Sequence, residues 1–207
     1  MKCNIKRKRA EEKVDSAYKT IGKTILAFLD ASAGCVICDF CGYKAKRLRE
    51  MYNGTQQVLG SMMEFYGAEN DDDRERADMS LFVAKRRLAE CGFDFASATE
   101  SLPASDTFGL TWHSDSEWQK HAQRAKLIQD MELVVQTYHA TLLLWFRQKC
   151  GYGKSRLSAL YALLRTDYNL LVTEYLRCCL AGDTQIRDML TARQDRMEKT
   201  GLEFVEV

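Results

Sequence analysis

The chain has 207 residues, of which 46% are hydrophobic and 29% charged, so it holds enough apolar material for a folded core and is not mainly disordered. The formal net charge of +1 excludes a protein that binds nucleic acid through its overall field, and such binding would need a local basic patch. The sequence has no apolar run long enough to span a bilayer and no apolar signal core, so we expect a cytoplasmic protein that contacts no membrane.

The first half of the chain predicts three helices. The first has apolar residues spaced three and four apart, at Leu26, Leu29, Ala33, Val36 and Phe40. It should end at Gly42, a residue type that suits the left-handed end of a helix. The second helix has the same spacing at Leu48, Tyr52, Thr55, Leu59, Met62 and Tyr66, which favours a helical hairpin with the first.

A third, shorter helix is expected from near Asp71–Asp73, where acids can cap it, to Gly92. Its apolar face carries Leu81, Ala84 and Leu88. Gly92 is followed by the apolar residue Phe93, as in a Schellman ending. Residues 97–115, which are rich in Ser, Thr and Asp and contain Pro103, then form a predicted linker.

The second half predicts the same three elements. Ser114 and Glu117 form a capping-box pattern before its first helix. Apolar residues of that helix are Ile128, Met131, Val135, Tyr138, Leu142 and Trp145, and it should end at Gly151. The next helix carries Leu157, Tyr161, Leu164, Tyr168, Leu171 and Tyr175. The last is expected from near Asp183–Thr184 to Gly201.

An internal repeat connects the two halves. An offset of 109 residues, without a gap, gives 12 identities over the 76 columns from position 20 to 95, and six of them fall between positions 41 and 52. This clustering at turn positions indicates a duplication. We therefore expect an all-α protein built as a tandem duplication of a three-helix unit, a pseudo-twofold helical bundle. Its parts are a first repeat at 1–96, a linker at 97–115 and a second repeat at 116–207.

The turn of the second half resembles a turn found in small helical proteins from phages and prophages of Firmicutes. It reads Gly151-Tyr152-Gly153-Lys154-Ser155-Arg156-Leu157, and the family often has Gly-aromatic-Gly-Lys-Lys-Arg-Leu between two helices. In the first half, Lys44 stands in place of the second glycine. The resemblance implies an origin in a mobile element and implies no defined chemistry.

Candidate metal and catalytic residues do not form a recognisable site. Cys35, Cys38 and Cys41 have the spacing of some iron–sulfur ligands, but they fall within a predicted helix and have no fourth ligand nearby. The histidines, at 113, 121 and 139, do not have zinc-hydrolase spacing, and no phosphate-binding loop or nucleophile elbow occurs. The sequence predicts a protein that is not an enzyme and binds no metal or cofactor.

The two turns are the candidate binding region. Their structural residues are Gly42, Tyr43, Gly151 and Tyr152, and their candidate partner-binding residues are Lys44, Lys46, Arg47, Arg49, Lys154 and Arg156. We expect these to bind a protein or ribonucleoprotein complex of a host or its defence systems, as a phage regulator or inhibitor would. The alternative is a helix-turn-helix-like protein that binds DNA or RNA through the basic turns. The oligomeric state is left open.

Arg47 and Arg156 occupy equivalent positions, five residues after each turn glycine. A guanidinium there can reach back and hydrogen-bond the carbonyls that end the preceding helix, which is the interpretation we favour. The alternative is that both arginines project outward and bind phosphates or carboxylates of a partner.

Overall fold

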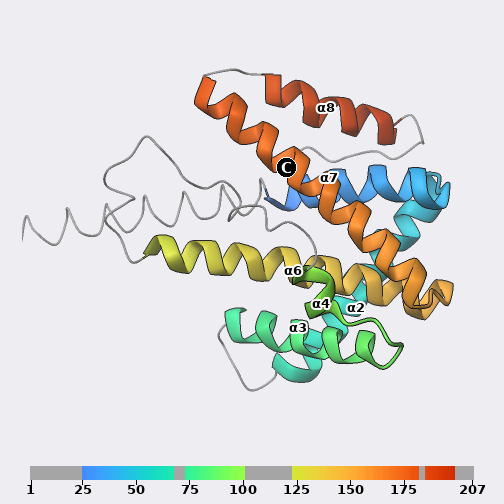
Figure 1. The fold of residues 1–207 in the computed structure, drawn as a ribbon. Helices are drawn as coiled ribbons and strands as arrows, with labels where there is room; N and C mark the ends of the chain where they lie inside the picture. Colours follow the sequence, from blue (N-terminus) through green and yellow to red (C-terminus); the bar gives the residue numbers. More distant parts are fainter. Residues whose placement is uncertain (1–24, 68–72, 101–122, 182–184, 199–207) are drawn as a thin grey trace, which may run out of the picture.

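The computed structural model describes residues 25–67, 73–100, 123–181 and 185–198, and all regular structure in these ranges is helical. The first helix is described over 25–41 and is called helix 25–41 below. The others are α2 (Ala45–Gly67), α3 (Asp73–Ala89), α4 (Phe95–Glu100), α6 (Gln123–Cys150), α7 (Lys154–Ala181) and α8 (Gln185–Glu198), as labelled in Figure 1. The predicted all-α class is confirmed.

Glycines end three of these helices, as predicted. Gly42, Gly92 and Gly151 have φ angles of 66°, 79° and 67°, a backbone conformation that residues with a Cβ rarely adopt. At Gly92 the Schellman pattern is complete, because the amide of Phe93 donates to Leu88 O at 3.2 Å and that of Gly92 donates to Ala89 O at 2.8 Å. Gly201 lies outside the described residues.

The predicted apolar faces are largely buried. The buried members are Leu29, Ala33, Val36, Leu48, Thr55, Met62, Leu81, Ala84, Leu88, Val135, Leu142, Trp145, Leu157, Tyr161, Leu164, Tyr168 and Leu171. Four further members are partly buried and pack against the core, namely Phe40, Tyr52, Leu59 and Tyr138. Leu26 is 45% exposed, so its assignment to the core was wrong. The structure does not describe the side chains at 66, 73, 128, 131 and 175, the capping box at 114–117, the acidic residues at 71–72 and 183–184, or the linker from 101 to 115.

The third helix of each half packs on the first helix of the other half. α3 lies along α6 (Figure 1), and Lys85 Nζ donates to Gln136 Oε1 at 3.1 Å. α8 lies against helix 25–41, where Met197 packs on Ala31 and Cys35 and Arg196 forms an ion pair with Asp39. The two halves therefore exchange their third helices, and the main core contains residues of both.

This exchange explains why α6 is more buried than its predicted stripe. All residues from 139 to 146 are buried, including Leu143 and Phe146, which are fully covered. α2, α3 and α7 each contact α6, so the helix is enclosed on several sides and not only along one stripe. Residues 97–100 also differ from the prediction, because they belong to α4 and not to the linker. Every helix in the described ranges is too short or too polar to span a bilayer.

Candidate binding surface at the two turns

The two turns contact each other through reciprocal pairs. The Tyr43 hydroxyl lies 3.2 Å from Cys150 Sγ, and the Tyr152 hydroxyl lies 3.4 Å from Cys41 Sγ. Cys41 and Cys150 are equivalent under the 109-residue offset, and so are Tyr43 and Tyr152. The tyrosine of each turn therefore contacts the cysteine that precedes the glycine of the other turn.

The two tyrosines stay neutral and belong to the packed interior. Each has only 7% of its surface exposed, and the Phe146 ring stacks on both, with centroids 6.0 Å from Tyr43 and 5.1 Å from Tyr152. Burial and the neighbouring Cys41 thiol raise the pKa of Tyr152 to about 12, and burial also raises the pKa of Cys41. The contact between Tyr152 and Cys41 is therefore made by neutral groups at physiological pH.

Arg47 and Arg156 lie over the tyrosines of their own turns. The guanidinium carbon of Arg47 is 5.0 Å from the centre of the Tyr43 ring, and that of Arg156 is 4.7 Å from the centre of the Tyr152 ring. Both side chains reach back to the turn, as expected, but their contact is a cation–π interaction with the ring and not the predicted hydrogen bond to helix-ending carbonyls. At the second turn it is Arg147 that approaches a carbonyl, Tyr152 O, at 3.5 Å.

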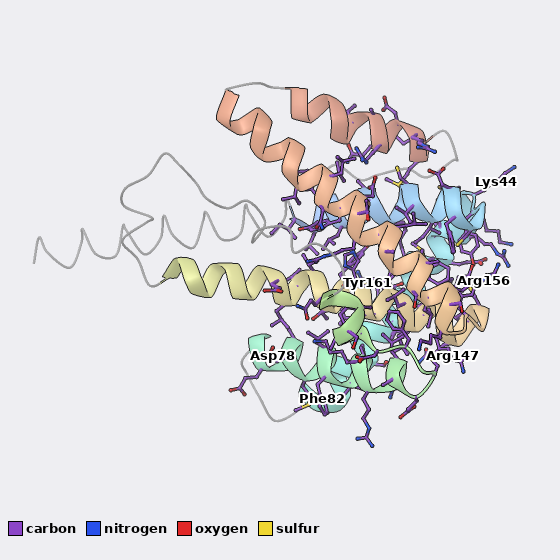
Figure 2. The ribbon with its side chains drawn as sticks, in the orientation of Figure 1. Lys44, Asp78, Phe82, Arg147, Arg156 and Tyr161 are labelled. Carbon is purple, nitrogen blue, oxygen red and sulfur yellow. The ribbon has the colours of Figure 1, made fainter. Side chains whose placement is uncertain are left out.

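Because the two turns are in contact, basic side chains from both halves lie close to one another. Eight exposed cations, here called the two-turn face, flank the turns at Lys44, Lys46, Arg47, Arg49, Arg147, Lys149, Lys154 and Arg156. Figure 2 shows Lys44, Arg147 and Arg156 on the same side of the molecule. The windows 38–50 and 147–159 contain eight basic and two acidic residues, a net charge of +6, whereas the whole chain carries +1. One of those acids, Asp39, is already paired with Arg196.

All six predicted partner-binding residues thus lie on this surface, and the structure adds Arg147 and Lys149. Both precede Gly151, at the end of α6, whereas all six predicted residues follow Gly42 or Gly151. A count of basic residues on both sides of the turn would have found them. No pattern in the sequence shows that the two turns meet.

A hollow of about 400 Å³ opens beside the two-turn face, between α2 and the end of α6. Its lining residues are Tyr43, Arg47, Glu50, Asn53, Gly54, Gln57, Trp145, Lys149 and Cys150. Charged and amide groups therefore surround an aromatic and apolar floor.

The three cysteines considered as metal ligands lie on helix 25–41, as predicted. Cys35 packs against α8, and burial raises the pKa of its thiol to about 11. Cys41 faces Tyr152, so the thiols serve separate contacts. In the ranges that the structure describes, no three His, Cys, Asp or Glu side chains are grouped so that they could hold a metal ion. His113 and His121 are outside these ranges.

His139 is buried between tyrosine rings. Its ring centroid is 5.8 Å from that of Tyr161 and 6.0 Å from that of Tyr168, and both contacts are edge to face. Burial, and then the nearby Arg165 cation, lower the pKa of His139 to about 3. The imidazole is therefore neutral at physiological pH and is part of the core.

In comparisons with known proteins, no family model, no curated protein and no solved structure matches the chain.

Proposed function

We propose that this chain is a non-enzymatic accessory protein of a phage or another mobile element, which binds a host or defence complex and regulates or inhibits it. The two-turn face is its contact surface. The observation that carries the proposal is that reciprocal Tyr–Cys contacts bring the cations of two distant segments onto one surface. The two sequence windows at the turns have a net charge of +6 on a chain of charge +1, and such a local excess of cations would attract and orient an anionic partner surface.

The aromatic residues at the turns favour a partner that is recognised by its shape and charge over one that is bound by base stacking. Tyr43 and Tyr152 are buried and pack on Phe146, so their faces are not free to stack on unpaired bases. Arg47 and Arg156 are exposed above them. An arginine held on an aromatic ring loses less freedom when it binds a carboxylate or phosphate, because the ring already restricts its side chain.

We also propose that the chain arose by tandem duplication and works as a fused pseudo-dimer. Two helix limits agree at the 109-residue offset, because helices end at 41 and 150 and begin at 45 and 154. The reciprocal Tyr–Cys contacts and the exchanged third helices support the same origin. Two identical units related by a two-fold axis would make each of these contacts twice.

The contact between the turns is an argument against the helix-turn-helix alternative in its two-site form. A two-fold repressor places its recognition helices about 34 Å apart, to fit successive major grooves. Here the equivalent turns touch, with Tyr43 Oη 3.2 Å from Cys150 Sγ. The helices that flank the second turn also have 28 residues each, whereas helix-turn-helix units use short helices.

A pulldown from bacterial lysate tests the proposal. Tagged wild-type protein should capture partner proteins that survive nuclease treatment, and the variant Lys44→Glu/Lys46→Glu/Lys154→Glu should lose them. All three side chains are exposed, so the variant should keep the wild-type melting temperature. Capture that is unchanged in this variant would refute the two-turn face as the contact surface. Capture that disappears with nuclease would favour nucleic acid as the partner.

A further inference from the structure

The residues of α2 that line the hollow differ in chemistry from the equivalent residues of α7. Four of its lining residues on α2 are Glu50, Asn53, Gly54 and Gln57. The equivalent positions on α7 hold Ala159, Ala162, Leu163 and Thr166. The carboxylate and both carboxamides are therefore present on one of the two helices only, although both helices begin at equivalent positions after their turns.

Gly54 allows the hollow to exist. A Cβ at this position would lie 2.0 Å from Nε1 of Trp145, so only glycine lets the indole lie directly against the backbone of α2. Trp145 has 6% of its surface exposed and forms part of the floor. On α7 the equivalent residue, Leu163, is 45% exposed and projects outward. The recess between α2 and α6 thus has an indole floor, whereas a side chain protrudes at the equivalent position of α7.

Two cations from different helices border this recess. Arg47 belongs to α2 and Lys149 to the last turn of α6, and both line the hollow together with Glu50. The Tyr43 ring lies 5.0 Å from the Arg47 guanidinium, which restricts the position of that group. Among the described residues, the Arg47 guanidinium has no hydrogen-bond partner, so its donors are available to a ligand.

We infer that the hollow is an anchor site for an acidic segment of a protein partner. A carboxylate of that segment lies between Arg47 and Lys149, the carboxamides of Asn53 and Gln57 bond its peptide groups, and an apolar side chain contacts the small exposed part of the Trp145 indole. Tryptophan and arginine are the residue types that contribute most to protein–protein binding energy. This inference rests on the proposed function and adds the chemistry of the partner and the residues that select it.

A protein segment fits this recess better than a nucleic acid backbone. Glu50 also lines the hollow and repels a phosphate and a carboxylate alike, so the choice between the two depends on the uncharged lining residues. The amide groups and the indole floor suit a peptide, which has both amide groups and apolar side chains. A phosphodiester backbone would leave the apolar floor unused.

The test uses the full chain and an acetylated, amidated peptide of alternating glutamate and leucine. A peptide with glutamine in place of glutamate is its neutral match, and a short DNA duplex is the nucleic acid probe. The ¹H–¹⁵N NMR signals of the Trp145 indole and of the Asn53 and Gln57 carboxamides should shift on titration with the acidic peptide. They should shift much less with the neutral peptide or the duplex.

Variants separate the hollow from the rest of the face. Lys149→Ala should weaken binding of the acidic peptide about tenfold, as loss of one charge-assisted hydrogen bond would. Lys46→Ala is the matched control, because it removes the same charge from an exposed position that does not line the hollow, and it should change the affinity less than about twofold. The double variant Gly54→Leu/Trp145→Val gives the recess the residues of the other half and should abolish binding.

Equal losses from Lys149→Ala and Lys46→Ala would overturn the inference, as would equal binding of the neutral peptide or preferential binding of the duplex. If the double variant does not fold, the comparison of Lys149→Ala with Lys46→Ala decides. Loss of lysate partners in Lys44→Glu/Lys46→Glu/Lys154→Glu, with wild-type capture by Lys149→Ala, would refute the hollow as the anchor and keep the proposed function. Capture that none of these variants alters would refute both.

Discussion

The His139 ring lies edge to face against Tyr161, with the ring centroids 5.8 Å apart, and the equivalent positions of the other half, Asp30 and Tyr52, are also in contact. There the Tyr52 hydroxyl donates to the backbone carbonyl of Asp30 at 2.7 Å. The same pair of positions, 22 residues apart, therefore joins the first and second helices of both halves. The chemistry of the two pairs differs, because one holds a buried imidazole and the other a partly buried carboxyl group.

This difference predicts how stability depends on pH. The pKa of His139 is lowered from 6.5 to about 3, so its neutral form contributes stability above pH 6.5, and that stability is lost as the pH falls toward 3. Each pKa unit corresponds to about 1.4 kcal/mol. Between pH 6 and pH 4, the unfolding free energy of His139→Leu should therefore fall by about 2–3 kcal/mol less than that of wild type. Urea denaturation at the two pH values measures this difference.

Asp30 acts in the opposite direction and provides the control. Burial raises its pKa above 3.8, although the hydrogen bond from Tyr138, at 2.6 Å, lowers it. A group with a raised pKa contributes stability below its unfolded pKa, and this is lost as the pH rises through the folded pKa. Asp30→Asn removes this contribution, so its stability should fall more steeply than that of wild type on acidification. A slope that neither variant changes would show that neither group titrates as the structure implies.

A second prediction concerns Gly42 and Gly151. Their φ angles of 66° and 67° cost a residue with a Cβ about 1–2 kcal/mol, and a Cβ would have open space at both sites. Gly42→Ala and Gly151→Ala should therefore lower the unfolding free energy by similar amounts, through backbone strain alone. Gly153→Ala is the matched control, because its site is also open and its φ is not positive. A cost at only one of the two sites would argue against equivalent turns.

Local features of the fold were predictable, whereas the contacts between the halves were not. Helix ends at Gly42, Gly92 and Gly151 depend on backbone conformation within a few residues, and the sequence shows it. The apolar face of α3 indicates that the helix needs a partner, but Leu81, Ala84 and Leu88 would fit either half. Its position on α6 is decided by the packing of the whole core.

The candidate site divides in the same way. The basic residues of each turn are visible in the sequence, but their union into one face depends on Tyr43 reaching Cys150. The hollow depends on the fit of Gly54 to Trp145, two residues that no spacing rule connects.

A third prediction tests the packing of α8 on helix 25–41. A Cβ on Gly34 would lie 1.9 Å from Sδ of Met197 and 2.9 Å from the Tyr52 hydroxyl. Gly34→Ala should therefore lower the unfolding free energy by about 1–3 kcal/mol, because Met197 is fully buried and must shift. Met197→Ala alone should cost about 2–5 kcal/mol, but in the Gly34→Ala background it should cost less, because it removes the clash. Gly60→Ala, at an open site in α2, should be additive with Met197→Ala. Additivity at Gly34 as well would mean that α8 does not pack there.

The last prediction concerns Arg47 and Arg156, which have the same contact in both halves. Each guanidinium lies over a tyrosine ring, at 5.0 Å and 4.7 Å, and an exposed cation–π contact contributes about 0.5–1 kcal/mol. Arg47→Ala/Arg156→Ala should thus lower the unfolding free energy by about 1–2 kcal/mol, measured by chemical denaturation. Arg47→Lys/Arg156→Lys should lose less than the alanine variant, because a lysine keeps the charge near the ring but lacks the planar group.

The same variants also separate the structural role of the arginines from binding. Lys44→Ala/Lys154→Ala removes equal charge from exposed positions of the face and should leave stability within about 0.5 kcal/mol of wild type. If the arginines also bind the partner, Arg47→Ala/Arg156→Ala should weaken capture more than this control and reduce its dependence on salt, because fewer charges then contact the partner. Wild-type stability in Arg47→Ala/Arg156→Ala would contradict the cation–π role. Wild-type capture by the same variant would show that the arginines hold the turns and do not contact the partner.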